Sequence, residues 1–175
     1  MGAGNTDKEF IMNPCNPFYA TTKDLVEYSD LVTSILASPS CITSIGTIEE
    51  DPHPKAPQDK DCLAYWDKDN EEICYGRYLI YKNTKGKKIK FWFGLSSKPK
   101  QENLIIWFKK TEINAGYINK LRNIFEPKKQ YHEPQNSDEV WITMEDKDFG
   151  DFCNNSSARK DIIKNFWQSV LRVLN

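Results

Sequence analysis

Long apolar runs are missing from this sequence of 175 residues. A transmembrane helix needs about 20 consecutive apolar residues, so we expect no attachment to a membrane. The segment from Met1 to Phe10 lacks the basic and apolar stretches of a secretory signal peptide. The five cysteines are irregularly spaced and form no CxxC pair, unlike the cysteines of a secreted disulfide framework. These absences together predict a protein of the reducing cytoplasm.

The sequence also lacks the motifs that bind nucleotides and metal ions. It contains neither a P-loop nor a G-x-G-x-x-G pattern. A calcium loop could begin at Asp67, but Glu72 stands in place of the turn glycine and Tyr78 in place of the bidentate acid. The only two histidines, His53 and His132, are distant in sequence from every cysteine, which argues against a zinc site. We therefore predict no cofactor, no metal ion and no catalytic residue.

Aromatic residues, by contrast, are abundant. They make up 13% of the chain, and all hydrophobic residues together make up 39%. This supply of apolar surface is enough to offset the entropy of ordering a chain, and the length suits one domain. We expect residues 1–20, rich in Asn, Gly and Pro, to form a flexible N-terminal arm. Residues 21–175 are expected to form a single α+β domain.

Apolar periodicity predicts three helices and an antiparallel sheet of four to five strands, with helices packed on at least one face. The helices are expected from Thr21 to about Ser38, from Ile113 to Phe125 and from Ala158 to Leu174. The strands are expected at Cys62–Trp66, Ile73–Tyr81, Ile89–Leu95, Leu104–Phe108 and Val140–Met144. Residues 49–61 hold three prolines and no large apolar side chain, which predicts a solvated loop.

The strand Leu104–Phe108 is apolar at every position. A strand in an antiparallel sheet usually alternates between apolar and polar residues, because one face meets solvent. This strand is therefore either covered on both faces or open on one face to a partner.

The formal net charge of −1 conceals a strong segregation of charge along the chain. Residues 1–74 carry a net charge of −9, residues 75–129 a net charge of +11, and residues 130–175 a net charge of −3. Such asymmetry is an argument about binding partners and not about fold.

The central basic block interleaves lysines with aromatic residues. The candidate binding residues are Lys85, Lys87, Lys88, Lys90, Trp92, Trp107, Lys109 and Lys110. Lysines can contact phosphates, and exposed aromatic side chains can stack on bases. Two other interpretations stay open. In one, the aromatic residues form the core and the lysines its solvated rim; in the other, the acidic flanks fold back and neutralise the block.

The order of the predicted elements resembles the αβββαβ core of the PD-(D/E)XK nuclease-like proteins. Enzymes of that family hold a divalent metal with an aspartate on the second core strand and an acid-x-Lys motif on the third. Here Ile89–Leu95 contains no acid, and in Trp107-Phe108-Lys109 a tryptophan replaces the carboxylate. An acid-x-Lys pattern at Glu145-Asp146-Lys147 comes one strand too late. The resemblance therefore implies a non-catalytic relative without a metal ion.

Three functional hypotheses follow. The first is a non-enzymatic protein-binding module that recognises a partner of complementary charge, since charge complementarity speeds encounter and selects partners. The alternative is a nucleic-acid-binding domain, in the form of a degenerate nuclease-like fold without metal-binding carboxylates. The third is an enzyme of unknown class with His132 or Glu145 at its site; only generic polar residues motivate it.

Overall fold

The computed structural model describes residues 45–51, 65–67, 72–98 and 101–175. The predicted N-terminal arm, the predicted helix that begins at Thr21 and most of the proline-containing segment 49–61 lie outside these residues. None of the helices within them has the length and apolar character that crossing a bilayer requires.

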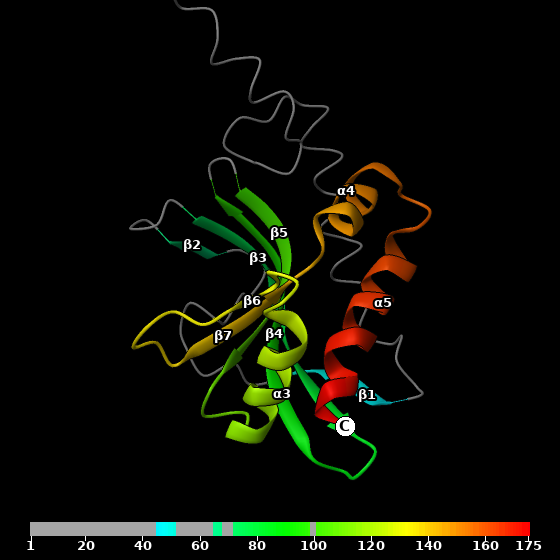
Figure 1. Ribbon diagram of the computed structural model, residues 1–175. Coiled ribbons are helices and arrows are strands. Elements are labelled where there is room, and N and C mark those ends of the chain that lie inside the picture. Colours follow the sequence, from blue (N-terminus) through cyan, green and yellow to red (C-terminus); the bar gives the residue numbers. More distant parts are fainter. Residues whose placement is uncertain (1–44, 52–64, 68–71, 99–100) are drawn as a thin grey trace, which may run out of the picture.

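The described part of the chain is organised around one antiparallel sheet (Figure 1). Its strands are β1 (Gly46–Glu50), β2 (Tyr65–Asp67), β3 (Glu72–Asn83), β4 (Lys88–Lys98), β5 (Gln101–Lys109), β6 (Tyr131–His132) and β7 (Glu139–Thr143). Six of them follow the order β1-β3-β4-β5-β7-β6, and β2 also pairs with β3.

The predicted α+β class is confirmed, and the sheet is larger than the four to five strands expected. The extra strands are β1 and β6, which are short and lie at the two edges. Glu49 and Glu50 belong to β1, so the prediction of a solvated loop from residue 49 was wrong at its start. Short edge strands carry little apolar periodicity of their own, because pairing with a neighbour stabilises them.

The turn between β3 and β4 contains the sequence Asn83-Thr84-Lys85-Gly86, and Asn and Gly are typical turn residues. Asn83 is buried, and its side-chain oxygen accepts hydrogen bonds from the backbone N–H groups of Lys85 and Lys87, at 3.0 and 2.9 Å. Gly86 has a φ of 79°, a left-handed conformation that glycine adopts without strain. The Asn83 amide also donates to the carbonyl oxygen of Leu174, which attaches the C-terminus to this turn.

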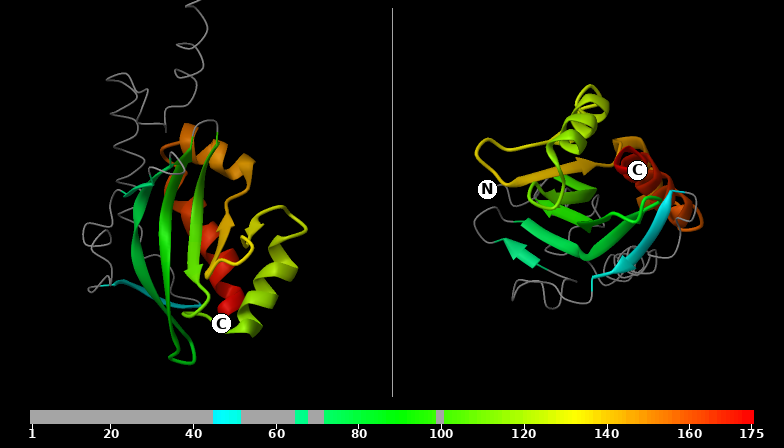
Figure 2. Two further views of the ribbon diagram at one scale, coloured as in Figure 1. Left: turned by 90° about the vertical axis from the view of Figure 1, so that its left-hand side faces the viewer. Right: turned by 90° about the horizontal axis from the view of Figure 1, so that it is seen from below.

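Three helices pack on one side of the sheet (Figure 2). They are α3 (Ala115–Phe125), α4 (Asp146–Asn154) and α5 (Arg159–Leu171), and the 3-10 turn η2 (Arg172–Leu174) continues α5. The predicted helices before and after β7 are confirmed, whereas α4 was not predicted. Arg159 is buried and donates to the backbone oxygens of Phe152 and Cys153, which joins the end of α4 to the start of α5.

The core lies between these helices and one face of the sheet. The residues of β4 and β5 that face the helices are buried. The helix α5 contributes Trp167, which is 0% exposed and packs edge-to-face on Phe93, with ring centroids 4.9 Å apart. The strand residues of the core are Leu79, Tyr81, Ile89, Phe91, Phe93, Leu95, Leu104, Ile106, Phe108, Val140 and Ile142. We call the opposite face, which these helices do not cover, the outer face.

Candidate functional site

Five ring-bearing side chains form a continuous line across the outer face. Each is the direct cross-strand neighbour of the next, from β3 through β4, β5 and β7 to β6. In this order they are Tyr78, Trp92, Trp107, Trp141 and His132, which we call the aromatic row. All five are partly exposed. Side chains alternate between the faces of a strand, so the core register of the sheet places the row on the outer face.

The rings of the aromatic row pack on one another and on the sheet. Tyr78 and Trp107 meet edge-to-face, with ring centroids 6.1 Å apart. His132 stacks on Trp141 at 5.7 Å with an angle of 14° between the ring planes. The ring of Trp92 leans over Gly76, where a Cβ atom would lie 2.6 Å from its Cζ2 atom. The row is therefore a preformed surface, because its side chains hold one another in place.

The three tryptophans of the row each carry an indole N–H group, which is a hydrogen-bond donor. In the part of the chain that the structure describes, Trp92, Trp107 and Trp141 donate no hydrogen bond to a protein acceptor. Partly exposed indoles of this kind combine a large apolar face with a free donor. The row thus offers ring surfaces for packing and N–H groups for orientation.

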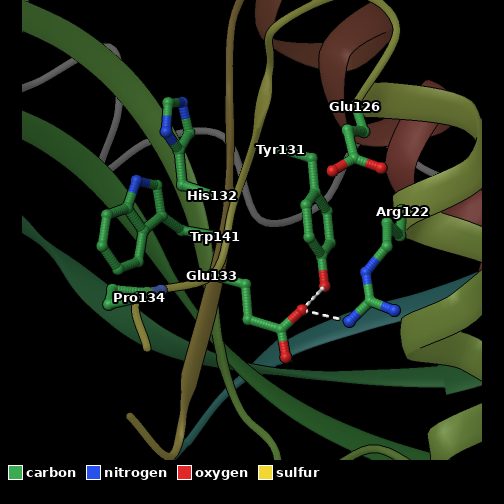
Figure 3. Close-up of a pocket in the computed structure, with 7 residues that line it drawn as sticks. All are labelled: Arg122, Glu126, Tyr131, His132, Glu133, Pro134 and Trp141. Carbon is green, nitrogen blue, oxygen red and sulfur yellow. Dashed lines mark hydrogen bonds and ion pairs between the residues drawn. The ribbon is translucent and has the colours of Figure 1, made fainter. Parts of the chain in front are cut away.

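An open hollow of about 440 Å³ lies at the β6 end of the aromatic row (Figure 3). Its lining residues are Arg122, Glu126, Tyr131, His132, Glu133, Pro134 and Trp141. Tyr131 and His132 are neighbours on β6 and point to opposite sides of it, so His132 joins the row while Tyr131 faces Arg122 of α3. The hollow therefore wraps around this edge strand.

The polar part of the hollow is centred on Glu133. Its carboxylate accepts hydrogen bonds from the Arg122 guanidinium and from the Tyr131 hydroxyl, the latter at 2.6 Å, and pairs with Lys110 at 2.9 Å. Hydrogen bonds from Tyr131, Arg122 and Lys110 lower the pKa of Glu133 to about 2. Burial and the bond to Glu133 raise the pKa of Tyr131 to about 12. The donors of this cluster are engaged within the protein, which suits a structural clamp between α3 and β6.

The clamp predicts a pH-dependent contribution to stability. The folded-state pKa of Glu133 lies below its usual value of 4.5, so its contribution is present above pH 4.5 and is lost as the pH falls towards about 2. We expect Glu133→Gln to lower the free energy of unfolding by about 1–2 kcal/mol at pH 7, with the difference from wild type shrinking below pH 4.5. Urea unfolding followed by circular dichroism between pH 7 and pH 3 measures this.

Glu126→Gln is the matched control, because Glu126 is exposed and lines the same hollow. We expect it to change stability by less than about 0.5 kcal/mol at every pH. A Glu133→Gln difference that is the same at pH 7 and pH 3 would contradict the clamp.

The structure places the predicted lysines on both sides of the sheet. Lys85 and Lys87 lie in the exposed β3–β4 turn, and the Lys87 ammonium sits 4.6 Å from the ring centroid of Tyr117 on α3. Lys88 and Lys90 alternate with the core residues of β4 and so lie on the outer face, where the Lys90 ammonium is 4.7 Å from the ring centroid of Tyr78. The lysines of this strand and turn therefore do not form a single track.

The two lysines at the end of β5, Lys109 and Lys110, also lie in different places. Lys109 is exposed on the outer face, directly opposite Glu139 of β7. Lys110 turns to the clamp, where its ammonium pairs with Glu133 and donates to the carbonyl oxygen of Ser137 at 2.7 Å. Trp92 and Trp107, the two predicted aromatic binding residues, stand next to each other in the aromatic row.

Within the part of the chain that the structure describes, four ion pairs join the basic block to the acidic segments on either side of it. Lys88 pairs with Glu49 at 3.6 Å and Lys90 with Asp51 at 2.5 Å. Lys110 and Arg122 both pair with Glu133. The acidic flanks thus fold back onto part of the block, one of the interpretations that the charge pattern left open. A part of the charge segregation along the sequence is therefore offset by ion pairs inside the molecule.

The geometry around His132 and Glu145 gives little support to a catalytic role for either residue. Burial lowers the pKa of His132, whose Nε2 lies 3.4 Å from the Thr143 hydroxyl, and no carboxylate of a described residue orients the ring. Glu145 is exposed at the start of α4. Among the described residues no group of three or more His, Cys, Asp or Glu side chains could hold a metal ion.

No protein-family model matches this chain, and no curated protein or solved structure is significantly similar to it. The resemblance to the PD-(D/E)XK nuclease-like proteins therefore gains no support from these comparisons. Its first helix lies outside the described residues, while the predicted three-strand meander, helix and strand are present as β3, β4, β5, α3 and β7.

Sequence reasoning singled out Trp92 and Trp107 as binding residues and named His132 only for a possible catalytic role; it did not place Tyr78, Trp141 or His132 beside the two tryptophans. The row can be predicted only if the register between neighbouring strands is known, because the register decides which residues lie opposite each other. An error of one residue in the register would place a ring on the core face of the sheet. The spacing of 14 residues from Tyr78 to Trp92 across a turn centred on residue 85 could have indicated the first pair. The strands β5 and β7 are separated in the sequence by α3, so the spacing between their residues does not indicate which of them pair.

Proposed function

We propose that this chain is a non-enzymatic protein-binding module and that the outer face of its sheet is the contact surface. The aromatic row carries the proposal. It places three tryptophans, a tyrosine and a histidine in one line on a face that the described helices leave uncovered. Tryptophan and tyrosine dominate the binding energy of protein interfaces, because they bury large rigid surfaces at low entropic cost.

The ion pairs alter how such a module recognises its partner. Lys88, Lys90 and Lys110 already have acidic neighbours, so a partner gains less from opposite charge than the sequence suggests. In this proposal the aromatic row supplies the affinity. The remaining charges at its border supply orientation, as rim charges do in other interfaces. We further propose the cytoplasm as the compartment, in keeping with the cysteine pattern.

Site-specific photo-crosslinking tests the contact surface. A benzophenone amino acid replaces Ile80, which lies on the outer face beside the row, or Ile124, the exposed isoleucine of α3 that is 44% accessible. The full-length chain carrying either probe is irradiated in an extract of its source cells, and adducts are identified by mass spectrometry. We expect a defined protein adduct from position 80 and none from position 124, because only the first probe reaches the proposed interface.

The same adduct should disappear when Trp107→Ala is added to the position-80 probe. Adducts of equal yield from both positions, or an adduct that is insensitive to Trp107→Ala, would contradict the proposal. Circular dichroism of each variant shows whether the fold is retained.

Nucleic-acid binding is the second candidate function, and the aromatic row is the observation that favours it. Rows of aromatic side chains stack single-stranded bases in many proteins, but such proteins also carry a continuous basic groove. The ion-paired lysines argue against that groove. We therefore expect fluorescence anisotropy to show a shallow salt dependence with single-stranded DNA between about 50 and about 200 mM salt, with a log–log slope nearer zero than about −1.4, the value for two phosphates. Tight binding that weakens by orders of magnitude over this range would favour the nucleic-acid function.

A further inference from the structure

We propose that the partner presents a proline-rich segment in the polyproline II conformation, and that this segment lies across the aromatic row from β3 to β6. The inference rests on the proposed protein-binding function and names the kind of segment that the outer face would accept. Four features of the row support it: its direction, its length, its hydrogen-bonding groups and the charges beside it.

The direction of the row excludes other common modes of peptide binding. An added β-strand would pair with an edge of the sheet, whereas the row crosses the sheet at right angles to its strands. A helix requires an open groove, whereas the ring of Trp92 leans over Gly76 and fills the space beside the row where Gly76 and Gly94 pair. An extended chain lying on the rings is the arrangement that remains.

The length of the row suits a short polyproline helix. Five neighbouring strands place their side chains over about 19 Å, since adjacent strands are about 4.8 Å apart. A polyproline II helix rises about 3.1 Å per residue, so about six residues would span the row. Six residues present about two turns of the helix, enough for several proline rings to meet aromatic rings.

The hydrogen-bonding groups of the row are complementary to this conformation. A polyproline II helix has no internal hydrogen bonds, so its carbonyl oxygens are free acceptors, and proline lacks an N–H donor. The row offers the opposite set, because the N–H groups of Trp92, Trp107 and Trp141 are donors that no described protein group accepts. A partner with both free donors and free acceptors would leave its donors unpaired against the indole rings.

The surrounding charges favour a segment of low net charge. On the outer face Lys88 and Lys90 are paired with Glu49 and Asp51, and Lys109 stands opposite Glu139. A polyanion would have to compete with these carboxylates, and a polycation with these lysines. A proline-rich segment avoids both costs and loses little conformational entropy on binding, since proline already restricts the backbone.

Selection from a library tests the inference. Phage displaying random peptides of about 12 residues, twice the length that the row accepts, are selected on the immobilised full-length chain. We expect proline to be enriched about threefold or more over the unselected library. We also expect individual peptides to bind Trp107→Ala about tenfold or more weakly, a loss typical of a hot-spot residue. Ile124→Ala, on the helix side, is the matched control and should bind as wild type does.

Trp141→Leu serves as a second row variant in case Trp107→Ala does not fold, and replacement of the prolines of a selected peptide by alanine should weaken its binding. Row-dependent peptides without prolines would overturn this inference and leave the protein-binding function standing. Proline-rich peptides that bind both row variants as well as wild type would overturn the inference and remove the row as the contact surface. A failure to select any peptide would overturn the inference, and strongly salt-dependent binding of single-stranded DNA that Trp107→Ala weakens would then assign the outer face to nucleic acid.

Discussion

Replacing Trp167 with alanine is expected to lower the free energy of unfolding by about 3–5 kcal/mol. Trp167 of α5 is 0% exposed and packs edge-to-face against Phe93 at the centre of the sheet. Truncation would leave a cavity between the helix and the core face, and rigid strands cannot collapse into it. Domains are typically stable by only about 5–15 kcal/mol, so much of the chain would be unfolded at moderate temperature. Urea unfolding monitored by circular dichroism measures the loss.

Two further variants make this expectation specific. The indole N–H of Trp167 is buried and has no hydrogen-bond partner among the described residues. Trp167→Phe keeps most of the ring and removes that unpaired donor, so we expect it to cost less than about 1.5 kcal/mol. Ile124→Ala, at an exposed position of α3, should change stability by less than about 0.5 kcal/mol. A Trp167→Ala loss no larger than that of Ile124→Ala would contradict the packing of α5 on the sheet.

Gly76→Ala is expected to destabilise the protein by about 2–3 kcal/mol. A Cβ atom at position 76 would overlap the carbonyl oxygen of Phe93 and lie 2.6 Å from the Cα atom of Gly94. These are backbone atoms of the neighbouring strand, which cannot move aside without breaking the sheet register. The sign of the effect is informative, because alanine ordinarily favours an ordered strand over glycine by about 0.5–1 kcal/mol. Thermal or urea unfolding gives the difference directly.

Gly150 of α4 is the matched control. A Cβ atom at position 150 would meet no atom within 4 Å, so Gly150→Ala should stabilise the protein by up to about 1 kcal/mol through helix propensity. Gly76→Ala should also shift Trp fluorescence, because the Trp92 ring lies over position 76. A stabilising Gly76→Ala would show that the outer face does not have the packing described above.

The parts of the fold that the sequence predicts well are those with strong local periodicity. The strands β3, β4, β5 and β7 and the helices α3 and α5 all follow from apolar spacing and turn residues. The helix α5 shows the limit of this reasoning. The apolar residues that recur at helical spacing within Ala158–Leu174 include Ile162 and Val173, which are only partly buried, whereas Ile163 and Trp167 are fully buried. The contact face of a helix is set by what it packs against, which periodicity alone locates only to within one residue.

The sequence by itself determined the α+β class, the antiparallel meander, the β3–β4 turn and the two tryptophans at positions 92 and 107. These features depend on interactions between residues close in the chain, or on alternation along one strand. Only the tertiary structure decided that Tyr78, Trp141 and His132 complete a line with them, and that Glu49, Asp51 and Glu133 neutralise part of the basic block. Cross-strand register and ion pairing join residues far apart in sequence, and their partners are chosen by the packing of the whole sheet.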